Sequence, residues 1–248
     1  MRKYLLIALI LFIGKVNAQQ IITDRPDQTE SSSTVPKGSL QIESGLLLSF
    51  IEANSETERQ LLAPTTLFRY GLTTGIEIRV LNQFENIKNI ENSNQESGIS
   101  DLEIGTKIQV LQKENINTEI AFLSHLIIPT GSKSLTNDRY GSINKISVSH
   151  SINKNIGIGY NGGYNYFGTG KGDLTYSLVL GIGISKKVGI YIETYGSVVE
   201  FENHESNFDT GFTYLLKDNF QLDFSFGTGI NYTMNYISIG FSWNIRNA

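Results

Sequence analysis

The chain has 248 residues, no cysteine and a formal net charge of −4. Without cysteine it can form neither a disulfide framework nor a thiolate metal site, and no basic stripe indicates a nucleic-acid partner. The mean hydropathy of −0.13 excludes a bundle of membrane helices. It does not exclude a membrane β-barrel, because the strands of such a barrel average an apolar face and a polar face.

The first eighteen residues have the pattern of a secretory signal peptide. Arg2 and Lys3 precede an apolar run over residues 4–13, and the small residue Ala18 lies at the expected cleavage site. The run is shorter than the ~20 residues that a spanning helix needs, which argues against a membrane anchor. We therefore expect residues 1–18 to be removed on export.

Apolar and polar residues alternate with period two from residue 40 to the end, and no stretch repeats with the helical period. The predicted strands lie around residues 40–50, 66–70, 76–80, 102–110, 120–128, 146–148, 156–164, 174–184, 188–192, 208–216, 220–226 and 237–245. Short turns alternate with longer polar links, such as those near 51–58 and 82–98, as in outer-membrane barrels. We predict an all-β fold over residues 38–248: a transmembrane antiparallel up-and-down β-barrel of about 12 strands, with both chain ends in the periplasm.

The distribution of charge distinguishes this barrel from a soluble, ligand-carrying one. The apolar face of the predicted strands carries no charge, whereas the opposite face carries nine acids and four bases, namely Glu43, Arg69, Glu77, Arg79, Asp101, Glu103, Lys107, Glu119, Lys145, Asp173, Glu193, Asp209 and Asp223. A bilayer favours such an uncharged stripe, because Arg or Lys on the lipid face at mid-depth costs ~2–4 kcal/mol. The charged face is therefore expected to line the lumen, where the excess of acids disfavours anions.

A polar constriction is the candidate functional site. Its predicted residues are Glu43, Arg69, Glu77, Arg79, Asp101, Glu103, Lys107, Glu119 and His125. Two cross-strand ion pairs are expected, Arg69 with Glu77 and Lys107 with Glu119, because each pair flanks a short turn with the same parity. The charges either stabilise the interior by pairing or select and gate permeants; the pattern alone leaves both readings open.

Residues 19–37 form a polar, periplasmic segment before the first strand. It contains "TDRPDQTES", with Asp24, Arg25, Asp27 and Glu30 as its charges. One reading is a loose tail, since chain termini are commonly disordered. The other is a lumen plug, in which Arg25 meets lumen acids, Asp24 or Asp27 meets Arg69 or Arg79, and Pro26 keeps the chain extended.

The last strand carries a candidate assembly signal. Ser238, Gly240, Trp243 and Ile245 have the spacing polar-x-Gly-x-x-aromatic-x-hydrophobic, although residues 246–248 extend past the usual end. The pattern resembles the signal that the outer-membrane barrel assembly machinery recognises; an ordinary last strand is the alternative. We expect outer-membrane lipids and that machinery as partners.

No motif indicates an enzyme, a cofactor or a metal site. "GIGYNG" matches a dinucleotide fingerprint but lies inside an alternating strand with no helix after it. The three histidines have no metal-ligand spacing, and Ser124 and His125 point to opposite faces of one strand. Only Ser147 or Ser149 could meet His125 in the lumen, as a Ser-His hydrolase pair would require.

Several stretches resemble one family. They include "TDRPDQTESSSTVPKGSLQIESG", "LFRYGLTTGIEIRV", "GISDLEIGTKIQV", "LIIPTGS", "IETYGS" and "DTGFTYLLKDNFQLDFSFGTGIN". Together they resemble the outer-membrane β-barrel family of Gram-negative bacteria that is named for the meta pathway of phenol degradation and whose members are also called transporters. The resemblance implies passive uptake of small molecules, with aromatic compounds among the candidates.

We therefore expect an outer-membrane channel or transporter for small molecules of unidentified type. The alternative is a structural or surface-interaction barrel with an occluded pore. Conductance distinguishes the two.

Overall fold

The computed structural model describes residues 21–53, 56–112 and 116–245, so the predicted signal peptide lies outside the described residues. Its strands are β1 (Leu40–Ala53), β2 (Glu56–Thr73), β3 (Ile76–Asn89), β4 (Gln95–Ile99), β5 (Leu102–Leu111), β6 (Thr118–Ile128), β7 (Gly141–Ser151), β8 (Ile156–Tyr166), β9 (Asp173–Gly183), β10 (Val188–Val199), β11 (Asn203–Lys217), β12 (Phe220–Gly229) and β13 (Met234–Ile245). Within these ranges, no helix is long and apolar enough to cross a membrane.

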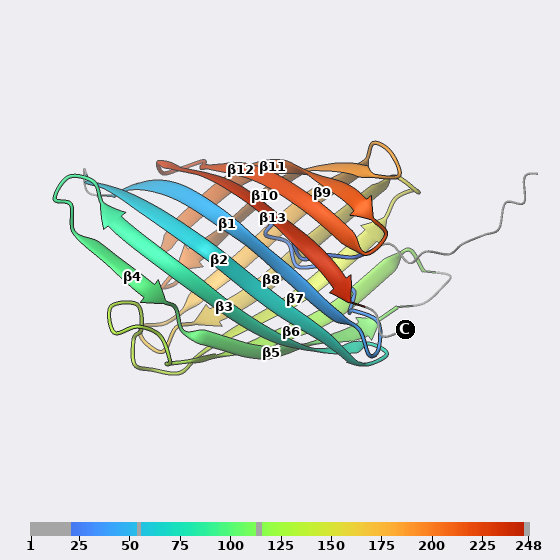
Figure 1. Ribbon diagram of the computed structural model, residues 1–248, viewed down its shortest axis with the longest axis horizontal. Helices are drawn as coiled ribbons and strands as arrows, with labels where there is room; N and C mark the ends of the chain where they lie inside the picture. Colours follow the sequence, from blue (N-terminus) through green and yellow to red (C-terminus); the bar gives the residue numbers. More distant parts are fainter. Residues whose placement is uncertain (1–20, 54–55, 113–115, 246–248) are drawn as a thin grey trace, which may run out of the picture.

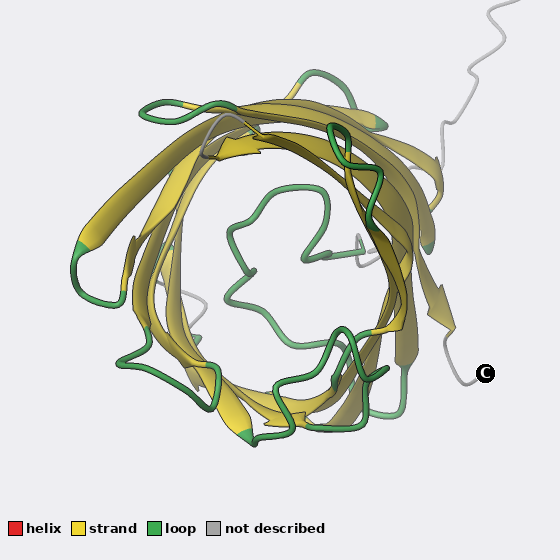
Figure 2. Ribbon diagram, turned by 90° about the vertical axis from the view of Figure 1, so that its left-hand side faces the viewer, coloured by secondary structure: helices red, strands yellow, loops and turns green. Residues whose placement is uncertain are grey.

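The strands form one closed antiparallel ring (Figures 1 and 2). Strand β1 pairs with β2 on one side and with β13 on the other, which closes the wall. The first half of β3, residues 76–81, pairs with β5, and its second half, residues 84–88, pairs with β4. Strands β4 and β5 therefore occupy the same position in the ring. The prediction of a twelve-stranded barrel is therefore confirmed, with one short additional strand.

Two predicted loops are wrong. The links expected at 51–58 and 82–98 are largely strand, because β2 already begins at Glu56 and β3 continues to Asn89. Their outer halves carry polar residues on both faces, so the sequence loses its alternation while the backbone ladder between Glu58 and Asn89 continues. Alternation of apolar and polar residues marks the part of a strand that contacts lipid, whereas hydrogen bonding between strands continues past the lipid.

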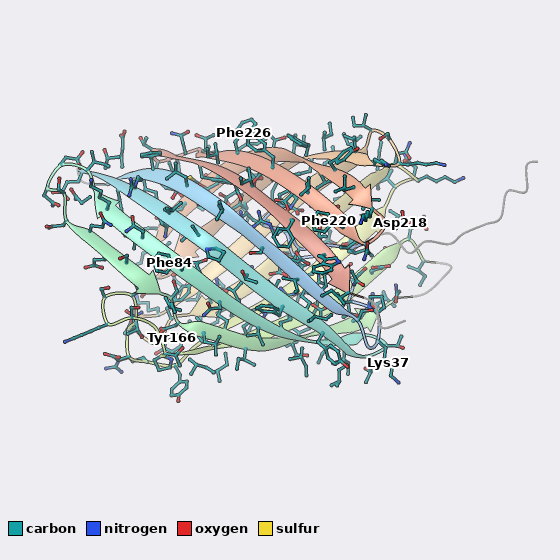
Figure 3. All side chains as sticks on the ribbon, in the orientation of Figure 1. Lys37, Phe84, Tyr166, Asp218, Phe220 and Phe226 are labelled. Atoms are coloured by element: carbon teal, nitrogen blue, oxygen red, sulfur yellow. The ribbon has the colours of Figure 1, made fainter. Side chains whose placement is uncertain are left out.

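The wall is apolar outside and polar inside. Phe84 and Phe226 project from its outer surface (Figure 3) and are 41% and 49% exposed. The three largest fully buried side chains of the described residues are instead ionic and face the lumen, namely Arg69, Arg79 and Lys107. This arrangement inverts that of a soluble protein and agrees with a membrane-spanning barrel.

The N-terminal segment, defined here as residues 21–37, runs inside the ring of strands as a loop (Figure 2). Its last residues lie beside β2, where Lys37 bridges to Gly71 and the Gly38 N–H donates to the Gly71 carbonyl at 2.7 Å. The segment enters at the end where β1 begins and β13 finishes, and Leu40 pairs there with Ile245. We call this the inner end.

Candidate functional site: the lumen and the N-terminal segment

A basic cluster lies on one side of the lumen. Arg69 of β2 and Arg79 of β3 are cross-strand partners, and Lys107 of β5 pairs in register with Glu77. The side chains of these three bases are at most 1% exposed. The wall itself supplies two acids: Arg69 contacts Glu43 at 2.8 Å and Glu77 at 2.9 Å.

Asp24 of the N-terminal segment lies at the centre of this cluster. Its carboxylate is 2.6 Å from Arg79, 2.9 Å from Lys107 and 3.1 Å from Arg69. Burial acts to raise the pKa of Asp24, but the three cations outweigh it and hold that pKa well below its usual value. Asp24 is therefore a fixed anion that links three strands of the wall.

Glu30 reinforces the same contact because the segment folds back on itself. The Ser31 N–H donates to Asp24 Oδ1 at 2.8 Å, which brings Glu30 to 2.9 Å from Arg79 and 3.4 Å from Lys107. The expectation that Pro26 keeps the chain extended is therefore wrong. A closed turn lets two acids of one short segment reach one basic cluster.

The segment also contacts the opposite side of the lumen. The Gln28 N–H and the Thr29 hydroxyl both donate to Glu193 of β10, and the Thr29 hydroxyl also shares a hydrogen bond of 2.7 Å with the Ser177 hydroxyl of β9. The Glu30 N–H donates to Asn161 of β8 at 2.6 Å. The segment therefore spans the lumen from β2, β3 and β5 to β8, β9 and β10.

Asp27 lies in a different electrostatic environment from Asp24. Burial and the nearby carboxylates of Glu193 and Asp209 raise the pKa of Asp27 well above its usual value. The structure records no ion pair for Asp27 within the described ranges. Of the two expected partners for the lumen arginines, Asp24 makes the contact and Asp27 does not.

Arg25 reaches a third part of the wall. Its guanidinium is 2.9 Å from Asp223 of β12, whose side chain is fully buried, and donates to the Ser238 hydroxyl of β13 at 3.1 Å. The expected contact between Arg25 and a lumen acid is present. Asp223 is an inward-facing acid that the sequence analysis did not place in the constriction.

The structure separates the other predicted constriction residues. Arg69 and Glu77 contact each other, but Lys107 and Glu119 are not paired: Lys107 lies opposite Leu123, and Glu119 accepts hydrogen bonds from Ser33 and Gln112. The two residues have the same parity, but Glu119 lies four residues along β6 from Leu123, the partner of Lys107, and a parity argument does not give that distance. The predicted Lys107–Glu119 pair is wrong.

Asp101, Glu103 and His125 have other roles. Asp101 accepts from the Gly131 N–H and the Thr136 hydroxyl, so it holds the 129–140 loop rather than the constriction. His125 Nε2 accepts from Arg79 Nε at 2.9 Å, which leaves its Nδ1–H for Glu103 at 2.8 Å. Both ring nitrogens are occupied, so His125 has no free nitrogen to serve Ser147 or Ser149 as a base.

A cavity of about 1100 Å³ lies between the N-terminal segment and the inner ends of β7 to β10. Glycines form part of its wall. A Cβ added at Gly157, Gly181 or Gly183 would stay 3.6 to 4.0 Å from its nearest neighbour, so each of these glycines has room for a methyl group. The cavity gives solutes at the inner end access to the segment.

The residues of the predicted assembly signal lie on both faces of β13. Ser238 and Gly240 face the lumen and contact Arg25, whereas Trp243 is 43% exposed on the outer surface and Ile245 pairs with Leu40. Recognition by an assembly machinery remains a prediction. Over the described parts of the chain, no group of His, Cys, Asp and Glu has the arrangement of a metal site.

Sequence reasoning missed several residues that hold the segment. Glu193 and Asp223 were among the charges predicted to face the lumen. The sequence therefore predicted their orientation but not the residues that they contact. Asn161 and Ser177 are uncharged and offered only the parity of their strands as a signal. Many polar side chains face the lumen, and only the path of the N-terminal segment distinguishes these four residues from the others.

Solved structures share this fold at low sequence identity. An outer membrane channel from Pseudomonas putida F1 has a TM-score of 0.74 and 11% identity, over 87% of this chain and 98% of that one. The KdgM porin, in complex with disordered oligogalacturonate, has a TM-score of 0.56 and 10% identity, over 82% and 98%. The translocator domain of the autotransporter NalP from Neisseria meningitidis has a TM-score of 0.50 and 10% identity, over 84% and 89%. A channel, a porin and a translocator share the fold, so function has to be argued from the lumen.

No curated protein matches the sequence significantly. The family model described as "Putative MetA-pathway of phenol degradation" matches residues 23–246, which include the N-terminal segment from Thr23 as well as all thirteen strands. The resemblance seen in the sequence is confirmed, and the chain belongs to this family.

Proposed function

We propose that this protein is an outer-membrane channel for the passive passage of small molecules and that its N-terminal segment restricts the pore. The observation that carries the proposal is the placement of Asp24 among Arg69, Arg79 and Lys107, in the lumen of a barrel whose exterior suits lipid. The N-terminal segment crosses the pore and is held by polar contacts rather than by an apolar core. Such contacts can exchange with water.

The polar lumen supports passage of solutes. Buried charges line it on both sides, and a water-filled channel needs such an interior. The family description supports small aromatic compounds as permeants, and the acid excess of the wall disfavours anionic ones. We propose a channel rather than an enzyme, because an outer membrane channel and a porin share its fold.

A second candidate is a structural barrel that the segment keeps closed. The contacts to β1, β2, β3, β5, β8, β9, β10 and β12 favour it, because they reach most of the ring. In that case the outer loops would carry the function. Outer-membrane lipids and the barrel assembly machinery are proposed as partners under either candidate.

Conductance across planar bilayers tests the proposal. Deletion of residues 21–34 should raise single-channel conductance and the rate of solute entry in liposome swelling, because it removes Asp24, Arg25 and Glu30 together. The matched control replaces the outer-loop residues 133–137, which lie at the other end of the barrel. Equal conductance before and after the deletion would contradict the restricting role. Conductance that is absent in the original protein and present only after the deletion would favour the barrel that the segment keeps closed.

A further inference from the structure

The ring has one ladder whose strands no turn connects. Strands β1 and β13 pair from Leu40↔Ile245 to Ile51↔Met234, although about two hundred residues separate the partners. Most other neighbouring strands in the wall are joined by short turns, which keep their ends together in the unfolded chain. Closing the β1–β13 seam carries a large loop-closure entropy, so this seam is the ladder that most needs added contacts.

Arg25 lies across this seam. Gly45 of β1, Gly240 of β13 and Asp223 of β12 form one row of cross-strand partners. The guanidinium covers the two glycines, because a Cβ added at Gly45 or at Gly240 would clash with Arg25 Nη2. It then meets Asp223 at the end of the row and Ser238 beside it.

Neighbouring residues of the segment bridge the same strands. Gln41 of β1 donates to the Ile22 carbonyl at 2.8 Å, and Gln221 of β12 donates to the Thr23 hydroxyl at 3.1 Å. The Asp24 N–H donates to Glu43 of β1 at 2.9 Å. Four consecutive residues therefore hold β1 on one side of the seam and β12 or β13 on the other.

We propose that residues 22–25 clamp the barrel seam, with Arg25 as the central residue. This function goes beyond restriction of the pore, because it concerns the closure of the wall. A planar guanidinium fits the site and an ammonium does not, since two glycines leave a flat floor and Asp223 accepts from both Nε and Nη2. Ser238 and Gly240 then have a direct role in holding the segment, independent of any assembly signal.

Hydrogen exchange of the folded, membrane-inserted protein tests the clamp strand by strand. Arg25→Ala should speed exchange of the β1 and β13 amides by about tenfold or more, as loss of charge-assisted hydrogen bonds implies, and leave β7 and β8 unchanged. Arg25→Lys keeps the charge but should give most of the same effect. Arg59→Ala is the matched control, because Arg59 is an arginine of β2 that donates to Asn86 of β3 away from the seam.

A cross-link supplies the second arm and covers the case in which Arg25→Ala fails to fold. The chain has no cysteine, so a disulfide between Leu46→Cys and Ile239→Cys, which are seam partners, can be formed and reduced at will. When oxidised it should restore folding or slow exchange in the Arg25→Ala protein. A disulfide between Tyr160→Cys and Leu178→Cys, which joins β8 and β9, should not.

The outcomes separate this clamp from the restricting role. Faster exchange in β1 and β13, with recovery by the seam disulfide alone, supports the clamp whatever the conductance. Exchange that rises only in residues 21–37, or equally in every strand, would overturn it. A rise in conductance with unchanged β1 and β13 exchange would leave the pore-restricting role standing and the clamp refuted.

Discussion

Inside the lumen, Asp24 Oδ2 lies 2.6 Å from Arg79 Nη1, and the two side chains are 3% and 1% exposed. One carboxylate from the N-terminal segment, which is not part of the wall, thus completes a cluster of three bases from three strands. Without Asp24, the bases Arg69, Arg79 and Lys107 would have only the wall acids and Glu30 to balance their charge. The wall and the segment therefore depend on each other.

Asp24→Asn should lower the stability of the folded barrel and raise its conductance. Removing one partner of a buried ion pair costs up to about 3–5 kcal/mol, because the remaining charges stay desolvated. The temperature at which heat-modified gel migration appears should fall, and open-channel events should become more frequent. Unchanged values of both would show that the Asp24 contacts contribute nothing.

Asp27→Asn should have the opposite effect on stability at neutral pH. The folded-state pKa of Asp27 is raised, so its ionisation weakens the fold as pH rises through that pKa, and the amide removes this cost. The thermal midpoint should exceed that of the original protein at pH 7, and the difference should vanish on acidification to about pH 4. A lower midpoint at pH 7 would contradict this electrostatic assignment.

The pH dependence of Asp24→Asn should differ in sign from that of Asp27→Asn. The folded-state pKa of Asp24 is lowered, so its contribution is complete above its unfolded pKa of about 3.9 and is lost as pH falls through the folded value. The midpoint difference between the original protein and Asp24→Asn should therefore be constant between pH 6 and pH 8, as measured across a buffer series. A difference that disappears in that interval would show that another group titrates.

His125→Phe should destabilise the barrel by about 1–3 kcal/mol, because it leaves Arg79 Nε without its acceptor. His125→Gln offers an amide oxygen in a similar position and should recover much of the loss in urea unfolding. Equal behaviour of the two variants would show that the volume of the side chain matters and its hydrogen bond does not.

Gly181→Phe should reduce conductance without reducing stability. The glycine faces the open cavity at the inner end, and an aromatic residue suits a strand better than glycine does. The effect should be clearest in the protein that lacks residues 21–34, where the segment no longer restricts passage. Gly45→Ala is the contrast, since its added methyl meets Arg25 and should destabilise the barrel.

The alternation of the sequence was enough to predict the barrel and the orientation of its residues. Leu46 and Ile239 are exposed on the outer surface and Glu43 and Lys107 are buried inside, because every strand crosses the same boundary between lipid and lumen. The strand ends were harder to predict. Polar residues on both faces of β2 and β3 hid their outer halves, which hydrogen bonding between strands extends past the lipid.

The sequence by itself determined that charges gather in the lumen and that a charged segment lies next to them. Only the tertiary structure decided which charges meet. The pairing register places Lys107 opposite Leu123 and away from Glu119, and the turn closed by Ser31 brings Asp24 rather than Asp27 to Arg79. The physical reason is that parity assigns a side chain to a face, whereas an ion pair needs a position within a few ångströms, which depends on the path of the whole chain.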